Sequence, residues 1–282
     1  MSAVADAAAR SAKLNRRNRP RLAVLTPVFN DQEGLERSLA SLAQDGAEFD
    51  VFVVDDGSEP HIRIPPALPY FVQLIRQDRN QGITHALNAG LKAISEFGHE
   101  YIARLDAGDV SLPGRLPAQA AYLDAHPECA AVGTAAEYVS PAGLTLFVMS
   151  LPLDHAGIIR RLRYGTAIIH SSVMLRNQAV TGVGGYKDTY EGGEDQELFF
   201  ALARHHKFAN LPDVYLKVEV KPVSITARRR RLVWQRLRIL ADNFNPISIH
   251  SYLGFAGNVA SLAVPRGAAL FLHRLFRKVR AE

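Results

Sequence analysis

Apolar runs and helical stripes alternate along the first part of the chain. LAVLTPVF (22–29) is an apolar run, and leucines at 35, 39 and 42 then recur at helical spacing. VFVVDDGS (51–58) is a continuous apolar run that ends in two acids, a glycine and a serine. That pattern is typical of a strand buried on both faces that runs into a turn. The chain therefore begins with a predicted strand, a helix and a second strand.

The same alternation continues to residue 105. FVQLI (71–75) and YIARL (101–105) are predicted strands, and residues 83–94 between them carry an apolar stripe at helical spacing. Strands that alternate with helices favour an α/β fold, with a mostly parallel sheet flanked by helices and right-handed crossovers. In such sheets, ligands bind beyond the carboxyl ends of the strands.

After residue 130 the pattern is mixed. Short apolar runs such as AAVGTAAEYV, GLTLFVM and HSSVML are followed by an acidic turn, a predicted helix near 195–205 and short runs at 208–217. The sequence contains no internal repeat and no low-complexity linker. These features indicate one continuous domain from residue 21 to residue 226.

The C-terminal part is basic and amphipathic. RRRRLVWQRLRIL (228–240) and LFLHRLFRKVR (270–280) place apolar residues at helical spacing among arginines, so 227–282 is a predicted basic helical extension. Such helices either pack on the domain with a solvated basic face or lie on an anionic membrane. In the second case, Trp234, Phe271 and Phe276 would lie near the lipid headgroups. No nucleic-acid motif accompanies the bases, so a nucleic acid is not an expected partner.

Composition narrows the class of protein. The 282 residues are 48% hydrophobic and 22% charged, as in soluble globular proteins, and the net charge of +5 is concentrated in the N-terminal arm and after residue 227. Cys129 is the only cysteine, which excludes an intramolecular disulfide and fits a reducing compartment. Residues 1–20 lack the apolar core of a secretion signal and are a predicted disordered arm. We expect a cytoplasmic protein with peripheral contact to the cytoplasmic membrane face through 228–282.

Acids follow two of the predicted strands. Asp55 and Asp56 end one strand and Asp106 ends another, so both strands bring carboxylates to the ligand side of the sheet. A buried charge there is costly unless a cationic or hydrogen-bonding group meets it. DDGS at 55–58 is either a plain turn or a contact to the base or ribose of a nucleotide. DAGD at 106–109 is either a capped turn or a site for a divalent cation completed by substrate phosphates.

Two glycine-containing helix starts offer further candidates. GGEDQELFF (192–200) places Glu194 and Asp195 at a helix N-terminus, where they either cap the helix or act as a base on a mobile turn. NQGITHALNAG (80–90) places Gly82 before a helix whose amides either start the helix plainly or meet a phosphate. His85, His155 and His170 are scattered without zinc-ligand spacing, so each is expected to be a hydrogen-bonding histidine.

The order of these motifs resembles the family 2 glycosyltransferases, which have the nucleotide-sugar-binding GT-A fold. TPVFND, VVDDGS, NQGITHALNAG, YIARLDAGDVSLPGRL, HSSVMLR, GGY and GEDQEL occur in sequence between residue 22 and about 226. The resemblance implies an inverting transferase that uses an activated sugar, commonly a UDP-sugar, with magnesium or manganese. It also implies a GT-A-like domain over 21–226.

The resemblance assigns roles residue by residue. The nucleoside would be contacted by Asp56, helped by Asp55 and by the strand end Thr26, Pro27 and Val28. Asp106 and Asp109 would serve the ribose, diphosphate and metal. The base would be Asp195 with Glu194 beside it. The donor pocket would be shaped by Gly82, Asn88 and His170.

The sequence departs from the family pattern at two places. Gly108 occupies the third position of a metal motif that often reads Asp-Ala-Asp-Asp, so Asp109 would have to substitute for the missing carboxylate. A Tyr-Arg-containing stretch often follows the base, but the comparable region here reads YLKVEVKPVS, with Lys217 and Lys221 as the nearby cations.

Three functions remain open at this point. The first is a glycosyltransferase of cell-envelope polysaccharide or glycolipid synthesis, with a glycan or lipid-linked acceptor. The second is a non-catalytic nucleotide-sugar-binding scaffold with a degraded metal site, which Gly108 suggests. The third is a nucleotidyltransferase, which needs a lysine-bearing phosphate loop near the first strand; TPVFNDQEG has no lysine.

Overall fold

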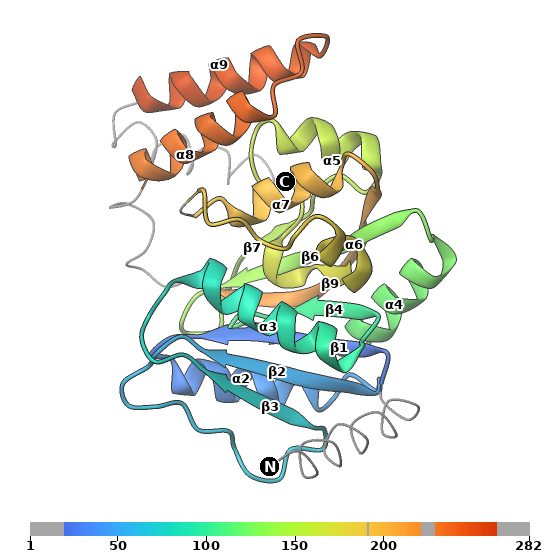
Figure 1. Cartoon of the computed structure of the whole chain (residues 1–282), viewed down its shortest axis with the longest axis vertical. Coiled ribbons are helices and arrows are strands. Elements are labelled where there is room, and N and C mark those ends of the chain that lie inside the picture. The colour runs from blue at the N-terminus through green and yellow to red at the C-terminus, as the bar shows by residue number, and fades with distance from the viewer. Residues whose placement is uncertain (1–19, 191, 221–228, 264–282) are drawn as a thin grey trace, which may run out of the picture.

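A mixed sheet forms the centre of the molecule (Figure 1). The computed structural model describes residues 20–190, 192–220 and 229–263. In that part of the chain the sheet has nine strands, in the order β3-β2-β1-β4-β8-β6-β9-β5, with β7 paired to β6. Helices cover both faces of the sheet, which confirms the predicted α/β architecture.

The four predicted strands of the first half form the parallel part of the sheet. They are β1 (Leu22–Val28), β2 (Phe49–Asp55), β3 (Val72–Arg76) and β4 (Tyr101–Arg104). β1 pairs in parallel with β2 and β4, and β2 pairs in parallel with β3. Val28 lies opposite Asp55, and Leu25 lies opposite Arg104. The carboxyl ends of these strands therefore share one edge, where the predicted site residues follow them.

The second half of the sheet contains both strand directions. Its members are β5 (Val110–Ser111), β6 (Cys129–Val139), β7 (Thr145–Met149), β8 (Met174–Arg176) and β9 (Lys207–Glu219). The short strand β8 is antiparallel to both β4 and β6, whereas β6 and β9 form a long parallel ladder. β8 thus links the two halves and runs against both of its neighbours, so β6 and β9 have the same direction as β1 to β4.

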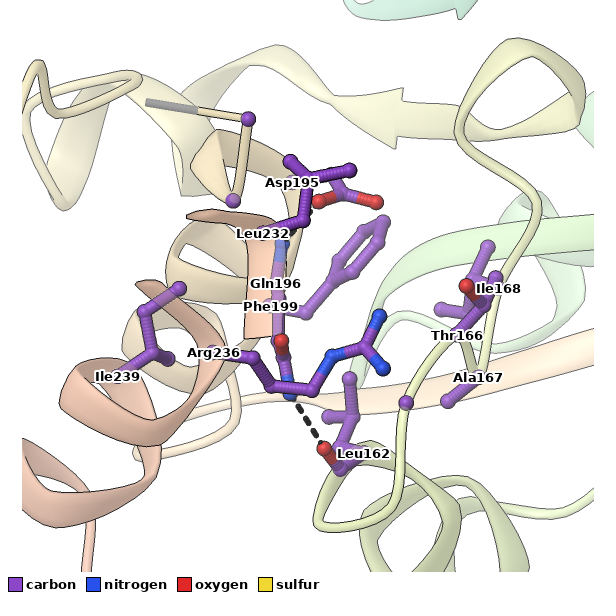
Figure 2. A pocket seen from close by; sticks show the side chains of 13 residues that line it. Leu162, Thr166, Ala167, Ile168, Asp195, Gln196, Phe199, Leu232, Arg236 and Ile239 are labelled. Carbon is purple, nitrogen blue, oxygen red and sulfur yellow. Dashed lines mark hydrogen bonds between the residues drawn. The ribbon is translucent and has the colours of Figure 1, made fainter. Parts of the chain in front are cut away.

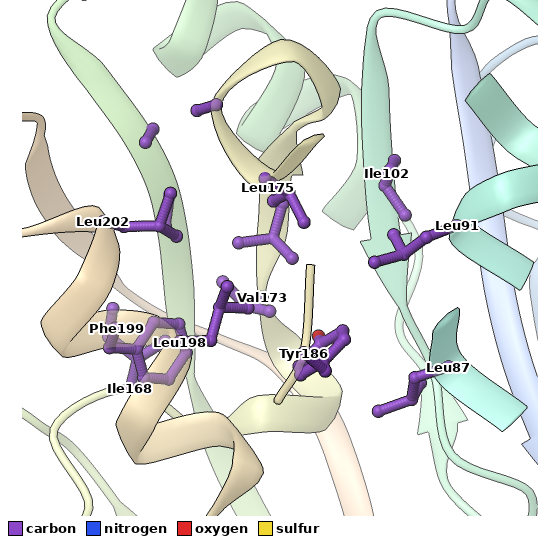
Figure 3. Close-up of a cluster of buried hydrophobic side chains, with 14 of the residues drawn as sticks. Leu87, Leu91, Ile102, Ile168, Val173, Leu175, Tyr186, Leu198, Phe199 and Leu202 are labelled. Carbon is purple, nitrogen blue, oxygen red and sulfur yellow. The ribbon is translucent and has the colours of Figure 1, made fainter. Parts of the chain in front are cut away.

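Alternate strand residues face two separate cores, as expected for strands covered on both sides. One core contains Ala23, Leu25 and Phe52 with helices α3 (Ile83–Phe97), α5 (His155–Leu162), α6 (Asn177–Gly182) and α7 (Glu194–Leu202). Figure 3 shows Leu87 and Leu91 of α3 in this core, with Leu198 and Phe199 of α7. The other core contains Leu22, Val24 and Val51 with α2 (Gln32–Leu42) and α4 (Arg115–Ala125).

A hairpin of two helices packs over α5 and α7 at the C-terminal end of the described chain (Figure 1). The predicted helix at 228–240 is observed as α8 (Arg229–Asp242), and its Leu237, Ile239 and Leu240 are buried. The second helix, α9 (Ile249–Ala263), lies within the predicted helical extension 227–282, between the two basic segments assigned there. The helix predicted at 270–280 and all but the last residue of the arm predicted at 1–20 lie outside the described residues.

Candidate active site

Asp55 stabilises the turn that follows β2. Its carboxylate is fully buried and accepts hydrogen bonds from the backbone amides of Ser58, at 2.9 Å, and Ile62, at 3.3 Å. Arg76 at the end of β3 lies 3.5 Å from the same carboxylate. Two backbone amides and one arginine therefore meet the Asp55 carboxylate within the protein. These contacts fix the loop that follows β2, beside the site.

Asp56 joins the end of β2 to the start of α3. Its two carboxylate oxygens accept from the amides of Gln81 and Gly82, each at 2.9 Å. Gly82 is the N-cap of α3 with φ +92°, in the region that favours glycine. The Gly82 amide, for which a plain helix start and a phosphate contact were the two alternatives, is thus bonded to Asp56. Because each carboxylate oxygen can accept a second bond, the predicted nucleoside contact of Asp56 stays a prediction.

The strand end at Thr26, Pro27 and Val28 is buried in the sheet. The Thr26 hydroxyl has no hydrogen-bond partner among the described residues. Phe29, which follows the strand, is 47% exposed. The strand end therefore positions the edge of the site, and the predicted contact to the nucleoside stays a prediction here too.

Arg104 meets the carboxylate of Asp106. This arginine is 1% exposed on β4; its Nη2 donates to Asp106 Oδ1 and its Nη1 donates to the Leu25 carbonyl at 3.0 Å. The Asp106 side chain remains 44% exposed at the strand end. A buried cation thus balances the acid, and Arg104 is a site residue that the predictions missed. The arginine inside the apolar run YIARL was the available signal.

Asp109 lies deeper than Asp106, at 8% exposure. Burial and the negative charge of Asp106 raise the pKa of Asp109 to about 7. A hydrogen bond from Ser171 lowers this pKa but does not outweigh them. Gly108 between the two acids has φ +101°, and its amide donates to Ser38 Oγ at 2.9 Å. The DAGD turn is therefore held rigidly, with one exposed and one buried carboxylate.

These two carboxylates are the available protein ligands for a divalent cation in this turn. Among the described residues, no three His, Cys, Asp or Glu side chains are grouped so that they could hold a metal ion. Magnesium is commonly bound by one or two carboxylates, with substrate phosphates and water completing the coordination. The raised pKa of Asp109 also fits a position that a positive charge would relieve. The donor set thus fits a cation that arrives with a diphosphate.

His170 and Asn88 are joined through Tyr186. His170 Nε2 lies 2.8 Å from the Tyr186 hydroxyl, and the Asn88 amide bonds to the Tyr186 backbone. Burial and the charge of Arg104 lower the pKa of His170 to about 4, so the imidazole is neutral at pH 7. Tyr186, whose pKa is raised by burial, is a further wall residue that the sequence assignments omitted.

Glu194 and Asp195 begin α7, as predicted. Burial and the charge of Asp195 raise the pKa of Glu194 to about 7, and its Oε2 has no partner among the described residues. Asp195 is half-buried, and its Oδ1 accepts from the Gln196 amide at 2.7 Å. Asp106 and Asp195 both act on the pKa of His170 and on that of Glu194. The acids of DAGD and of GEDQEL therefore both lie near His170 and Glu194.

Asp195 also lines a cavity of about 70 Å³ between α7, α8 and the segment 162–168 (Figure 2). Gln196 donates to the Leu162 carbonyl at 2.6 Å and fixes one wall. Arg236 of α8 extends into the same space. No sequence pattern pointed to this residue, because its position depends on how α8 folds back over α7.

The other two histidines have structural partners. His155 Nδ1 accepts from the Phe208 amide at 3.2 Å, and His85 Nε2 lies 3.8 Å from Asp188. The His155 contact is a hydrogen bond, as expected, whereas the distance from His85 to Asp188 is too long for one.

Comparison with known proteins identifies the family. Residues 23–182, more than half of the chain, match the model of glycosyl transferase family 2. This chain belongs to glycosyl transferase family 2. The amylovoran biosynthesis glycosyltransferase AmsE of Erwinia amylovora is 31% identical over 216 residues, which cover 73% of this chain and 79% of AmsE. The putative glycosyltransferase EpsE of Bacillus subtilis is 28% identical over 174 residues, 60% of each chain.

Solved structures show the same fold. S. aureus TarS 1-349 in complex with UDP-GlcNAc has a TM-score of 0.64 at 17% identity, covering 84% of this family 2 chain and 71% of that one. The mannosyltransferase PcManGT from Pyrobaculum calidifontis, in complex with GDP-Man and Mn²⁺, has a TM-score of 0.59 at 20% identity. The match covers 92% of this chain and 80% of PcManGT. These similarities confirm the GT-A architecture.

Proposed function

We propose that this family 2 glycosyltransferase transfers a sugar from a nucleoside-diphosphate donor to an acceptor hydroxyl with inversion, using Asp195 as the base. The observation that carries the proposal is the shared site of Asp106 and Asp195, which both act on the pKa of His170 and of Glu194. A donor held at the DAGD turn would then lie near Asp195. One carboxylate group would then serve the leaving diphosphate and the other the attacking hydroxyl.

The donor side of the site consists of the strand ends and the DAGD turn. Asp56 would bind the nucleoside, and Asp106 with Asp109 would hold a divalent cation, Mg²⁺ or Mn²⁺, which would supply positive charge to the departing diphosphate. His170 and Asn88, through Tyr186, form the wall. A UDP-sugar is the proposed donor, supported by the complex of TarS with UDP-GlcNAc, while the complex of PcManGT with GDP-Man and Mn²⁺ supports the cation.

Inversion follows from a single displacement. The acceptor hydroxyl attacks the anomeric carbon on the face opposite the diphosphate, its proton passes to the Asp195 carboxylate, and the sugar–phosphate bond breaks. The same placement of a base across the sugar from the leaving group operates in inverting hydrolases, where water is the nucleophile. Glu194 lies beside Asp195 as a buried carboxyl, and burial raises its pKa to about 7.

The proposed role is polysaccharide or glycolipid synthesis at the cell envelope, with a glycan or lipid-linked acceptor. The name of AmsE, an amylovoran biosynthesis glycosyltransferase, supports this class of product. Peripheral contact with the cytoplasmic face of an anionic membrane, through 228–282, is the proposed means of reaching such an acceptor. Within the described residues, no helix has the length and apolar character to span a bilayer.

An exposed apolar surface on the C-terminal hairpin supports membrane contact. Its members lie on the α8–α9 turn and along one side of α9: Phe244, Ile247, Ile249, Tyr252, Leu253 and Val259. The α9 sequence has no Asp, Glu, Lys or Arg, whereas the sequence that follows it, 264–282, carries Lys or Arg at positions 266, 274, 277, 278 and 280. Apolar side chains beside basic residues match the interface of an anionic bilayer.

Turnover with Asp195→Asn tests the proposed function. We expect transfer from a UDP-sugar, in a panel of donors and acceptors with Mn²⁺, to fall by at least about a hundredfold in this variant, because the proton acceptor is lost. Asp213→Asn, on the exposed part of β9, is the matched control and should retain full activity. Full activity of Asp195→Asn would remove the proposed base. Donor binding without turnover in the wild type would instead favour the non-catalytic scaffold.

A further inference from the structure

Arg236 brings a positive charge from the C-terminal hairpin into the cavity beside Asp195. Its side chain extends from α8 toward the segment 162–168, and Asp195 lies at the other end of the cavity (Figure 2). A Cβ atom built on Gly165 would lie 3.4 Å from Arg236 Nη1, so the guanidinium fits closely against this segment. In the described part of the chain, no carboxylate lies within ion-pair distance of Arg236. A half-buried guanidinium in this position lacks a close counter-charge.

A second arginine, Arg161, lies near Arg236 but outside the lining of the cavity. Burial and the like charge of Arg161 lower the pKa of Arg236, whereas the negative charge of Asp195 raises that pKa. Arg161 is held near by a hydrogen bond from its Nε to the Thr166 carbonyl at 3.1 Å. The N-terminus of α7, capped by Gly193 without a side-chain hydrogen bond, also borders the cavity. The Arg236 guanidinium and a helix N-terminus that border one cavity suit the binding of an anion.

Neither Asp106 nor Asp109 of the DAGD turn lines the cavity, whereas Asp195 does. The negative charges of Asp106 and Asp195 both raise the pKa values of His170, Tyr186 and Glu194. Arg236 is affected by Asp195 but not by Asp106. An anion bound at Arg236 is therefore separate from a diphosphate bound at the DAGD turn.

We propose that the cavity between α7 and α8 is an acceptor subsite, in which Arg236 binds a phosphate or diphosphate group that the acceptor carries near its attacking hydroxyl. The inference rests on the proposed function, because it takes Asp195 as the base. Arginine is suited to this role, since its planar guanidinium binds phosphate through two parallel hydrogen bonds. The volume of about 70 Å³ suits one such group rather than a whole sugar nucleotide.

The test is calorimetric binding of glucose 1-phosphate to the full chain, without vesicles and with UDP and Mg²⁺ at saturating concentration. UDP fills the donor site, and glucose is the matched ligand without a phosphate. We expect glucose 1-phosphate, but not glucose, to bind the wild type. Arg236→Gln should weaken that binding roughly ten- to hundredfold, the effect of losing hydrogen bonds to a charged group, and Arg236→Lys should restore part of it.

Two controls distinguish a lost phosphate contact from a damaged fold or a changed net charge. Arg238→Gln removes an exposed arginine of the same helix, which lies 5.9 Å from the centre of the Tyr190 ring, and should leave phosphate binding unchanged. Arg236→Gln should keep the melting temperature and the UDP affinity of the wild type. Equal binding of glucose 1-phosphate by Arg236→Gln, no binding by the wild type, or competition between glucose 1-phosphate and UDP would overturn the acceptor subsite. Failure of UDP itself to bind the wild type would count against the proposed function.

Discussion

Asn88 holds the backbone of Tyr186 with both ends of its side-chain amide. Its Nδ2 donates to the Tyr186 carbonyl at 2.7 Å, and its Oδ1 accepts from the Tyr186 amide at 3.0 Å. Tyr186 in turn places its hydroxyl 2.8 Å from His170 Nε2. A residue of helix α3 thus positions, through one tyrosine, the imidazole on the far wall of the site.

Asn88→Ala should therefore lower both stability and activity. The variant leaves two backbone groups of Tyr186 without partners, and we expect the free energy of unfolding to fall by roughly 1–3 kcal/mol. Donor affinity should fall as well, because His170 loses its support. Urea unfolding and UDP titration measure the two effects. Lys92→Ala, at an exposed position of the same helix, is the control; an Asn88→Ala variant as stable as this control would contradict the role of the amide.

The parallel half of the fold was predictable because its signals are local. The runs at 22–29 and 51–58 end in turn residues, and the observed strands β1 and β2 lie within or beside them. Each strand is buried on both faces, so the apolar run needs no partner to be recognised. The rule for strand ends then placed Asp106 at the ligand edge of the sheet.

The interior of the site was less predictable because its contacts join distant parts of the chain. Arg104 stands visibly in an apolar run, but its hydrogen bond to the Leu25 carbonyl joins β4 to β1 and is not specified by that run. The hydrogen bonds of Asp56 to the start of α3 depend on how the β2 turn meets that helix. Arg236 reaches the cavity beside Asp195 only through the packing of α8 on α7, which no local pattern specifies.

The packing of the hairpin depends on Gly254. A Cβ atom built on this residue of α9 would lie 2.2 Å from the carbonyl oxygen of Arg163, whereas one built on Gly257 would meet nothing within 4 Å. We expect Gly254→Ala to destabilise the protein by roughly 1–3 kcal/mol, because the helix must move away from the backbone. Gly257→Ala should stabilise it by about 1 kcal/mol through helix propensity. Thermal unfolding of the two variants measures the contrast, and equal melting temperatures would refute the close approach at Gly254.

Membrane contact through the hairpin predicts which surface residues matter. Ile247 is 94% exposed and Leu253 is 52% exposed, so Ile247→Gln with Leu253→Gln removes apolar contact area without disturbing a core. We expect the double variant to sediment with phosphatidylglycerol vesicles several-fold less than the wild type. Leu144→Gln, 69% exposed in the turn between β6 and β7, is the matched control and should bind vesicles as before. Unchanged sedimentation of the double variant would exclude this surface as the contact.

The buried acid Asp109 predicts an unusual dependence of stability on pH. Its pKa is about 7 in the folded protein and near 3.8 in the unfolded chain, so the folded state keeps a proton that the unfolded state loses between these values. Its contribution therefore lowers the free energy of unfolding as pH rises from about 4 to 7. Relative to the wild type, Asp109→Asn should become more stable over this range, by roughly 2–4 kcal/mol at pH 8.

Asp124 provides a comparison of opposite sign for this prediction. Hydrogen bonds from Arg21 and Tyr101 lower its pKa, so its contribution to stability is present above the unfolded pKa and is lost as the solution becomes acidic. Asp124→Asn should thus lose stability at neutral pH relative to the wild type, whereas Asp109→Asn gains it. Urea unfolding of the three proteins at pH 5 and pH 8 measures both differences. If the stability of Asp109→Asn matched that of the wild type at both pH values, the Asp109 carboxyl would ionise in the folded protein without cost. The DAGD turn would then not require a cation to relieve its charge.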